Sequence, residues 1–151
     1  ISDYQIRYIM KKLILTSLIM LLGIFTYSQS VLGTWKTIDD KTGKAKSHVK
    51  ITQLSDGTLK GEVVKILTPG RENAKCDECK GANKGKPIKG MTIIWDMKKS
   101  GDEWTGGYIL DPNSGSEYKC RIRVKDENTL ELRGYVGISL LGRNQTWHRV
   151  K

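Results

Sequence analysis

The sequence predicts an all-β fold, an eight-stranded antiparallel up-and-down barrel with one long loop between its third and fourth strands. Short β-rich runs recur from residue 32 to the end, turn residues separate them at regular spacing, and no long helical apolar pattern interrupts them. Antiparallel strands joined by tight turns leave two unpaired edges unless the sheet closes. A two-sheet sandwich is the alternative, because periodicity does not distinguish it from a barrel.

The predicted strands follow one another along the chain. The second and sixth alternate most clearly: Val49 and Ile51 flank a lysine, and Cys120 and Ile122 flank an arginine. Such strands bury one face and expose the other. Segments rich in Asp, Asn, Ser and Gly separate the strands, as turn geometry favours. The predicted strands are residues 33–38, 44–54, 58–67, 91–97, 103–110, 117–124, 129–136 and 143–150.

The N-terminal part of the chain has the succession of basic, apolar and polar segments that is typical of an export signal. Met10 is followed by two lysines and by an uncharged apolar run at residues 13–27, which polar residues end. The run is shorter than the roughly 20 residues of a membrane-spanning helix, so we expect cleavage after Ser28 and no transmembrane segment afterwards. Residues 1–9 are interpreted as an upstream, non-structural segment, 10–28 as the signal peptide and 29–151 as one β-barrel domain. The predicted location is periplasmic or secreted.

The length and net charge of the chain exclude several classes of function. A chain of 151 residues supports one domain, which excludes multidomain enzymes. The formal net charge is +10, yet no helix-turn-helix, zinc-finger or aromatic RNA-binding signature accompanies it, so we expect no nucleic-acid partner. An anionic envelope surface is the candidate partner for this charge. We expect a monomer.

Three segments carry a family resemblance. Leu32-Gly33-Thr34-Trp35 resembles the Gly-x-Trp start of the first strand in lipocalins and streptavidin-like barrels. Together with the stretches at residues 104–112 and 134–147, it resembles the exported bacterial family catalogued as domain of unknown function 2147. The resemblance extends from about Val31 to the end of the chain. It implies a lipocalin-like barrel and carries no established activity, ligand or catalytic residue.

The long loop at residues 68–90 is basic and holds a Cys-x-x-Cys pair, Cys76 and Cys79. In an exported protein, such a pair forms a structural disulfide, half of a zinc site or a thiol-exchange site. Zinc needs two more ligands, and His48 and His148 lie far away in the sequence. We therefore predict a disulfide, no metal and no cofactor. Cys120 is interpreted as a buried apolar thiol.

Aromatic residues supply the candidate ligand site. They could line a cavity or fill the barrel, since an eight-stranded barrel is just wide enough for either. Met91, Ile93, Trp95 and Met97 are predicted to share one face of the fourth strand, and Trp35 is assigned the structural role of closing the barrel floor. Residues 137–142 form an apolar, glycine-bounded connection that is a candidate functional rim. The candidate ligand-binding residues are Trp95, Trp104, Tyr108, Tyr135, Leu140, Leu141, Arg143 and Trp147.

Three hypotheses about function follow. The first is an uncharacterised exported barrel that binds a small apolar or amphipathic ligand without catalysis, because no nucleophile–base or phosphate-loop motif is present. The second is a filled barrel that acts as a protein-interaction or envelope-maintenance module through the rim. The third is thiol or zinc chemistry at Cys76 and Cys79.

Overall fold

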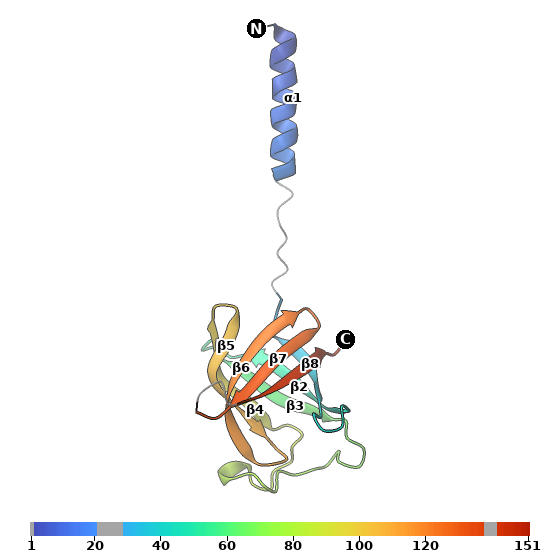
Figure 1. Ribbon diagram of the computed structural model, residues 1–151, viewed down its shortest axis with the longest axis vertical. Helices are drawn as coiled ribbons and strands as arrows, with labels where there is room; N and C mark the ends of the chain where they lie inside the picture. The colour runs from blue at the N-terminus through green and yellow to red at the C-terminus, as the bar shows by residue number, and fades with distance from the viewer. Residues whose placement is uncertain (1, 21–28, 138–141) are drawn as a thin grey trace.

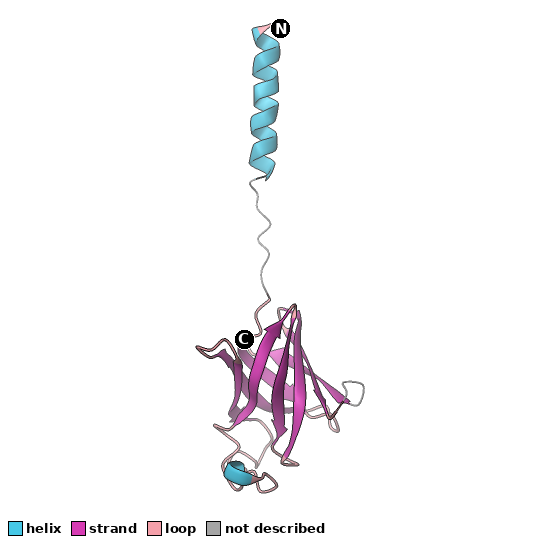
Figure 2. Cartoon of the chain, turned by 90° about the vertical axis from the view of Figure 1, so that its left-hand side faces the viewer, coloured by secondary structure: helices cyan, strands magenta, loops and turns pink. Residues whose placement is uncertain are grey.

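The computed structural model of the protein describes residues 2–20, 29–137 and 142–151. Eight strands form one closed antiparallel barrel in sequence order (Figures 1 and 2). Closure is shown by the pairing of the first strand with the last, Trp35 with Arg149 and Lys36 with His148. The barrel prediction is confirmed, and the sandwich alternative is wrong. The strands are β1 (Gly33–Ile38), β2 (Ala45–Gln53), β3 (Leu59–Ile66), β4 (Thr92–Ser100), β5 (Glu103–Asp111), β6 (Ser116–Asp126), β7 (Thr129–Tyr135) and β8 (Gly142–Arg149).

A helix, α1 (Asp3–Met20), precedes the barrel in the chain. Among the helices in the described part of the chain, none has both the length and the apolar character needed to cross a membrane. The chain segmentation and the cleavage site stay predictions.

Strand β4 departs from simple alternation because it is bulged. Asp96 has a φ of 57°, the left-handed backbone region, and the pairing with β3 shifts register on both sides of Ile94. A bulge of this kind turns neighbouring side chains onto a different face. Ile93 and Ile94 are consequently both buried, whereas Trp95 is only half-buried. The predicted sharing of one face by Met91, Ile93, Trp95 and Met97 is therefore wrong at Trp95.

The two ends of the barrel differ. The β2–β3, β4–β5 and β6–β7 turns are short and lie at one end, which we call the floor, together with the chain segment that enters β1. The β1–β2, β3–β4, β5–β6 and β7–β8 connections lie at the other end, which we call the mouth. The long loop leaves the barrel at the end opposite the C-terminus (Figures 1 and 2).

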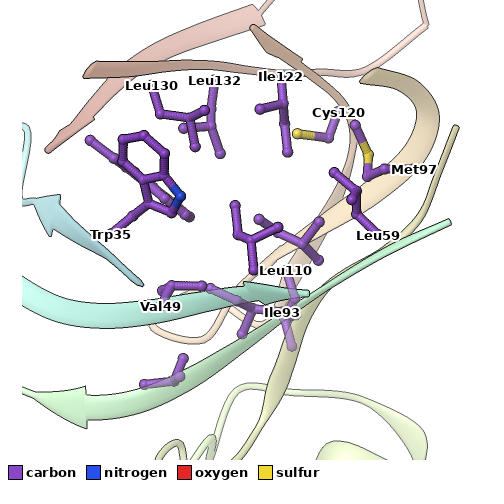
Figure 3. Packing of buried hydrophobic residues seen from close by; sticks show 14 of the residues in the cluster. Trp35, Val49, Leu59, Ile93, Met97, Leu110, Cys120, Ile122, Leu130 and Leu132 are labelled. Carbon is purple, nitrogen blue, oxygen red and sulfur yellow. The ribbon is translucent and has the colours of Figure 1, made fainter. Parts of the chain in front are cut away.

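Apolar side chains point into the barrel from strands all around it (Figure 3), and those nearest the floor pack against one another. Trp35 is wholly buried there, and its indole Nε1 donates a hydrogen bond to the carbonyl oxygen of Val31 at 2.8 Å. The Val49–Ile51 and Cys120–Ile122 alternation is confirmed, because all four side chains are buried. Other side chains with almost no exposed surface are Leu59, Met97, Leu130 and Trp147.

The long loop between β3 and β4 is folded and packed on the barrel. Its two arms pair at Lys75 and Pro87, where the amide of Cys76 donates to the carbonyl of Lys86 at 2.8 Å. Cys76 and Cys79 form a disulfide, as predicted, with their Cα atoms 5.3 Å apart. A one-turn 3₁₀ helix, η1 (Gly81–Asn83), follows.

This loop contacts the β5–β6 turn directly. The sulfur of Cys76 lies 3.1 Å from the carbonyl oxygen of Pro112. Gly115, at the end of the same turn, has a φ of 66°, and a Cβ there would collide with the carbonyl oxygen of Glu78. The loop is therefore held by a close backbone-to-backbone approach that only glycine permits.

Candidate functional site

A cavity of about 630 Å³ occupies the mouth half of the barrel. This volume falls within the range of small-molecule sites. Its walls come from the mouth-side ends of the strands and from the long loop, while the floor half stays packed. The barrel is thus filled at one end and hollow at the other.

The deeper wall of the cavity is apolar. Its side chains come from strands on all sides of the barrel, because the inward positions near the middle of each strand carry aliphatic or aromatic residues. Gly134 on β7 also faces the cavity, and a Cβ there would make ordinary contacts with the side chains of Tyr118 and Ile109, 3.5 and 3.6 Å away. The apolar wall is formed by Val63, Ile66, Ile93, Ile109, Leu132 and Trp147.

Polar groups on the β1, β2 and β8 side are paired with one another. Thr37 and Ser47 share a hydrogen bond of 2.8 Å between their hydroxyl oxygens. On β8, Trp147 Nε1 donates to Gln145 Oε1 at 3.0 Å, and Gln145 Nε2 donates to Asp40 Oδ2 at 3.2 Å. This chain of hydrogen bonds fixes the orientation of the Trp147 ring in the cavity wall.

Charged side chains are concentrated at the mouth. The guanidinium of Arg143 forms an ion pair with Asp40 from the β1–β2 connection. Lys46 Nζ on β2 lies 3.8 Å from Asp111 Oδ1 at the end of β5, two side chains whose strands are three positions apart in the barrel. This ion pair therefore reaches across the mouth. Arg71, from the long loop, also lines the cavity.

The long loop forms part of the cavity wall. Besides Arg71, it contributes Thr68, Ala74 and Ile88. Ile88 is buried, and its amide donates to the carbonyl of Ala74 at 2.9 Å, which ties the two arms of the loop together beside the cavity. Access to the cavity therefore depends on how this loop is folded.

The structure brings together only some of the residues that the sequence suggested. Tyr135, Arg143 and Trp147 line the cavity. Leu140 and Leu141 lie outside the described residues. Trp35 lies at the floor.

The remaining three aromatic candidates lie away from the cavity wall. Trp95 and Tyr108 pair across β4 and β5 and stack with ring centroids 5.8 Å apart, and Tyr108 keeps 38% of its surface exposed. Trp95 follows the register shift beside Ile94, and Tyr108 follows the irregularity of β5 at Gly106, which has a φ of 79°, so both rings lie on the outer face. Trp104 is buried opposite Ile122 in the packed half of the barrel, with Lys99 Nζ 5.5 Å from its ring centroid.

Sequence reasoning overlooked several wall residues. Lys46 belongs to an alternating strand and was expected on the wet face, but it lies where the pairing of β1 with β2 shifts register, and it lines the cavity. Arg71 and Ile88 belong to a loop whose path no periodicity encodes. Ile93, by contrast, sits on the face predicted for it, and Tyr118, two residues before Cys120 on the same alternating strand, also lines the cavity.

Among the described residues, neither the third cysteine nor the carboxylates form a cluster suited to nucleophilic or metal chemistry. Cys120 is a free, buried thiol, and burial raises its pKa from 9.0 to about 12. A thiol with this pKa holds its proton at neutral pH and is a poor nucleophile. No group of three or more His, Cys, Asp and Glu side chains positioned to hold a metal ion is found among the described residues.

Comparison with known proteins agrees with the geometry. The family model described as "Uncharacterized protein conserved in bacteria (DUF2147)" matches residues 33–149. A solved structure, described as protein HP1028 from the human pathogen Helicobacter pylori that belongs to the lipocalin family, superposes with a TM-score of 0.72 at 18% sequence identity. The match covers 82% of this chain and 85% of that chain, and it shows a shared lipocalin-like fold. A search of curated protein sequences finds no match.

Proposed function

The chain belongs to the DUF2147 family of bacterial proteins, and we propose that this member binds a small apolar or amphipathic molecule inside its lipocalin-like barrel. The cavity of about 630 Å³ carries the proposal. Burying an apolar ligand against aliphatic walls removes apolar surface from water, which contributes roughly 25 cal/mol per Å². The polar groups at the mouth then orient the ligand.

The proposed role is non-catalytic binding. The carboxylates around the cavity are engaged in ion pairs and turns, and Cys120 holds its proton at neutral pH. The lipocalin-like fold supports a carrier or binding protein rather than an enzyme. We further propose that binding takes place outside the cytoplasm. Two features support this: residues 10–28 resemble a signal peptide, and Cys76 and Cys79 form a disulfide.

A first test is native mass spectrometry of the purified protein, followed by the same sample denatured. We expect a stoichiometric adduct that disappears on denaturation, and its mass identifies the class of ligand. A bare chain, after incubation with a mixture of lipids and small apolar molecules, would count against the proposal.

A second test fills the cavity from within. Gly134→Leu places a side chain in the cavity without a clash at its Cβ, because the nearest heavy atom is 3.5 Å away. We expect the variant to lose ligand binding and to keep its melting temperature. Gly134→Ala is the matched control, since it adds only a methyl group and should retain binding.

The connection at residues 137–142 supports a second candidate function, a protein-interaction or envelope-maintenance module. Val136, just before it, borders the cavity and keeps 65% of its surface exposed. An exposed apolar side chain next to an apolar segment is typical of an interaction surface. Under this candidate, Val136→Asp and Leu140→Asp would abolish partner binding and leave melting unchanged, and Gly134→Leu would have no effect on it.

A further inference from the structure

The polarity of the cavity changes along the barrel axis. Val63, Ile93 and Leu132 form its deep wall, and the charged side chains that line it all lie at the mouth. A ligand that fills this space would therefore place its apolar part toward the floor and its polar part at the mouth. This geometry suits an amphiphile with one head group.

The cations at the mouth differ in how far they are already neutralised. Arg143 is held in an ion pair with Asp40, so little of its charge is free for a ligand. Arg71 makes no ion pair or side-chain hydrogen bond with any described residue, although it lines the cavity. It is the cation with the most unused donor capacity at the mouth.

Lys46 is the second cation that can serve a ligand. Its Nζ is 3.8 Å from Asp111 Oδ1, which is beyond hydrogen-bond distance. That carboxylate oxygen already accepts the amide of Asn113 at 3.0 Å. The ammonium group of Lys46 therefore keeps donors for a group that enters from the solvent.

The surrounding surface has the same sign. The long loop that forms one side of the mouth carries more basic than acidic side chains, in a protein whose net charge is +10. The cavity lining itself holds Asp39 and Asp111 beside Lys46, Arg71 and Arg143, and both carboxylates accept backbone amides of their own turns. The positive excess of the loop and of the whole protein raises the local concentration of anions and repels cations. Cationic amphiphiles are consequently disfavoured, and anionic ones are drawn in.

We propose that the ligand is a single-chain amphiphile with an anionic head group, which Arg71 and Lys46 hold at the mouth while its tail occupies the apolar cavity. This inference rests on the proposed binding function and names the class of ligand. A carboxylate and a phosphate monoester both satisfy it, because guanidinium and ammonium groups bind either anion.

Ligands that share one tail and differ in the head group test the charge preference. The full chain is loaded with the neutral fluorescent probe N-phenylnaphthylamine, and dodecanoate, dodecyl phosphate, dodecanol or dodecyltrimethylammonium is added below its micellar concentration. We expect at least one of the two anions to displace the probe at a lower concentration than dodecanol, and the ammonium compound to displace it least. The preference for the anion should shrink as salt is added.

Two variants locate the head group. Arg71→Gln and Lys46→Gln should each weaken dodecanoate or dodecyl phosphate binding by roughly fivefold, the effect of a partly exposed ion pair, and leave dodecanol unchanged. Lys84→Gln is the matched control. It removes the same charge from the same loop, but Lys84 Nζ donates to the carbonyl of Asp77 at 3.2 Å and does not line the cavity. Unchanged dodecanol binding shows that the variants are folded.

Specific results would overturn the inference. If dodecanol displaces the probe as well as both anions do, or if Lys84→Gln weakens anion binding as much as Arg71→Gln, the head-group assignment fails and the binding function stands. If the probe does not bind, or if it binds equally to Gly134→Leu, the proposed cavity function fails as well.

Discussion

The guanidinium carbon of Arg149 lies 4.2 Å from the centroid of the Trp35 ring. The same guanidinium donates hydrogen bonds to the carbonyl oxygens of Ser30 at 2.6 Å and Leu32 at 2.9 Å, while its Nε donates to the carbonyl oxygen of Glu127. One side chain from the last strand thereby fixes the segment that enters the first strand. This contact seals the floor of the barrel where its sheet closes.

Replacing Arg149 should destabilise the whole barrel. Arg149→Ala removes the cation–π contact and leaves three carbonyl groups without this donor, so we expect the free energy of unfolding to fall by about 2 kcal/mol. Urea denaturation followed by tryptophan fluorescence measures the change. Lys50→Ala, an exposed mid-strand control, should change the free energy of unfolding by less than about 0.5 kcal/mol. Equal effects of the two variants would contradict the assigned role.

The contact between the long loop and the β5–β6 turn predicts an unequal response of two glycines. Gly115→Ala adds backbone strain and a collision with Glu78, whereas Gly57→Ala adds strain alone, because nothing lies within 4 Å of its Cβ. Both glycines have positive φ, so each substitution should cost about 1 kcal/mol for strain. Hydrogen exchange should show the long loop loosened only in Gly115→Ala.

Removing the disulfide should affect the loop first. The double variant Cys76→Ser with Cys79→Ser frees a short closed segment, and the chain-entropy treatment of such a loop gives a loss of about 2 kcal/mol. Faster amide exchange is expected at residues 75–88, with the strands of the barrel still protected. Because Ala74 and Ile88 line the cavity, probe binding should weaken in parallel. Loss of protection throughout β1–β8 instead would show that the disulfide supports the barrel itself.

The buried Cys120 predicts a stability loss at high pH. Burial raises its pKa to about 12, so the folded state holds the thiol proton where an unfolded thiol, with a pKa near 9.0, releases it. The stabilising contribution is therefore complete below pH 9 and is lost as the pH rises toward 12, at up to about 1.4 kcal/mol per pH unit. Comparing the unfolding free energy of the protein and of Cys120→Ala across this range isolates the effect. Parallel curves for the two proteins would contradict it.

The features that could be predicted from the sequence are those that depend on residues close together in the chain. Strand positions were predictable because alternation and turn residues act over a few neighbours, and the β1 prediction, residues 33–38, agrees with the structure at both ends. The disulfide was predictable from the spacing of Cys76 and Cys79. Barrel closure followed from the need to pair edge strands.

The cavity wall was harder to predict, because it depends on backbone irregularities and on long-range packing. The register shift beside Ile94 turned Trp95 out of the interior, and the alternation of apolar residues in this strand gives no local warning of it. Arg71 belongs to a loop that packs on Gly115, far away in the sequence, and such packing leaves no periodic pattern. Aromatic residue type therefore proved a poorer guide to the wall than the inward-facing aliphatic positions.

The floor contact of Arg149 also determines how the molecule can be attached to something else. Residues 30–32 and the end of β8 are held side by side at the floor, and the mouth is built entirely from internal connections. A tether attached before β1 or after β8, whether a fused domain or a sensor surface, would thus leave the cavity facing outward. The protein could be immobilised through either terminus for binding measurements without obstructing the route by which a ligand enters.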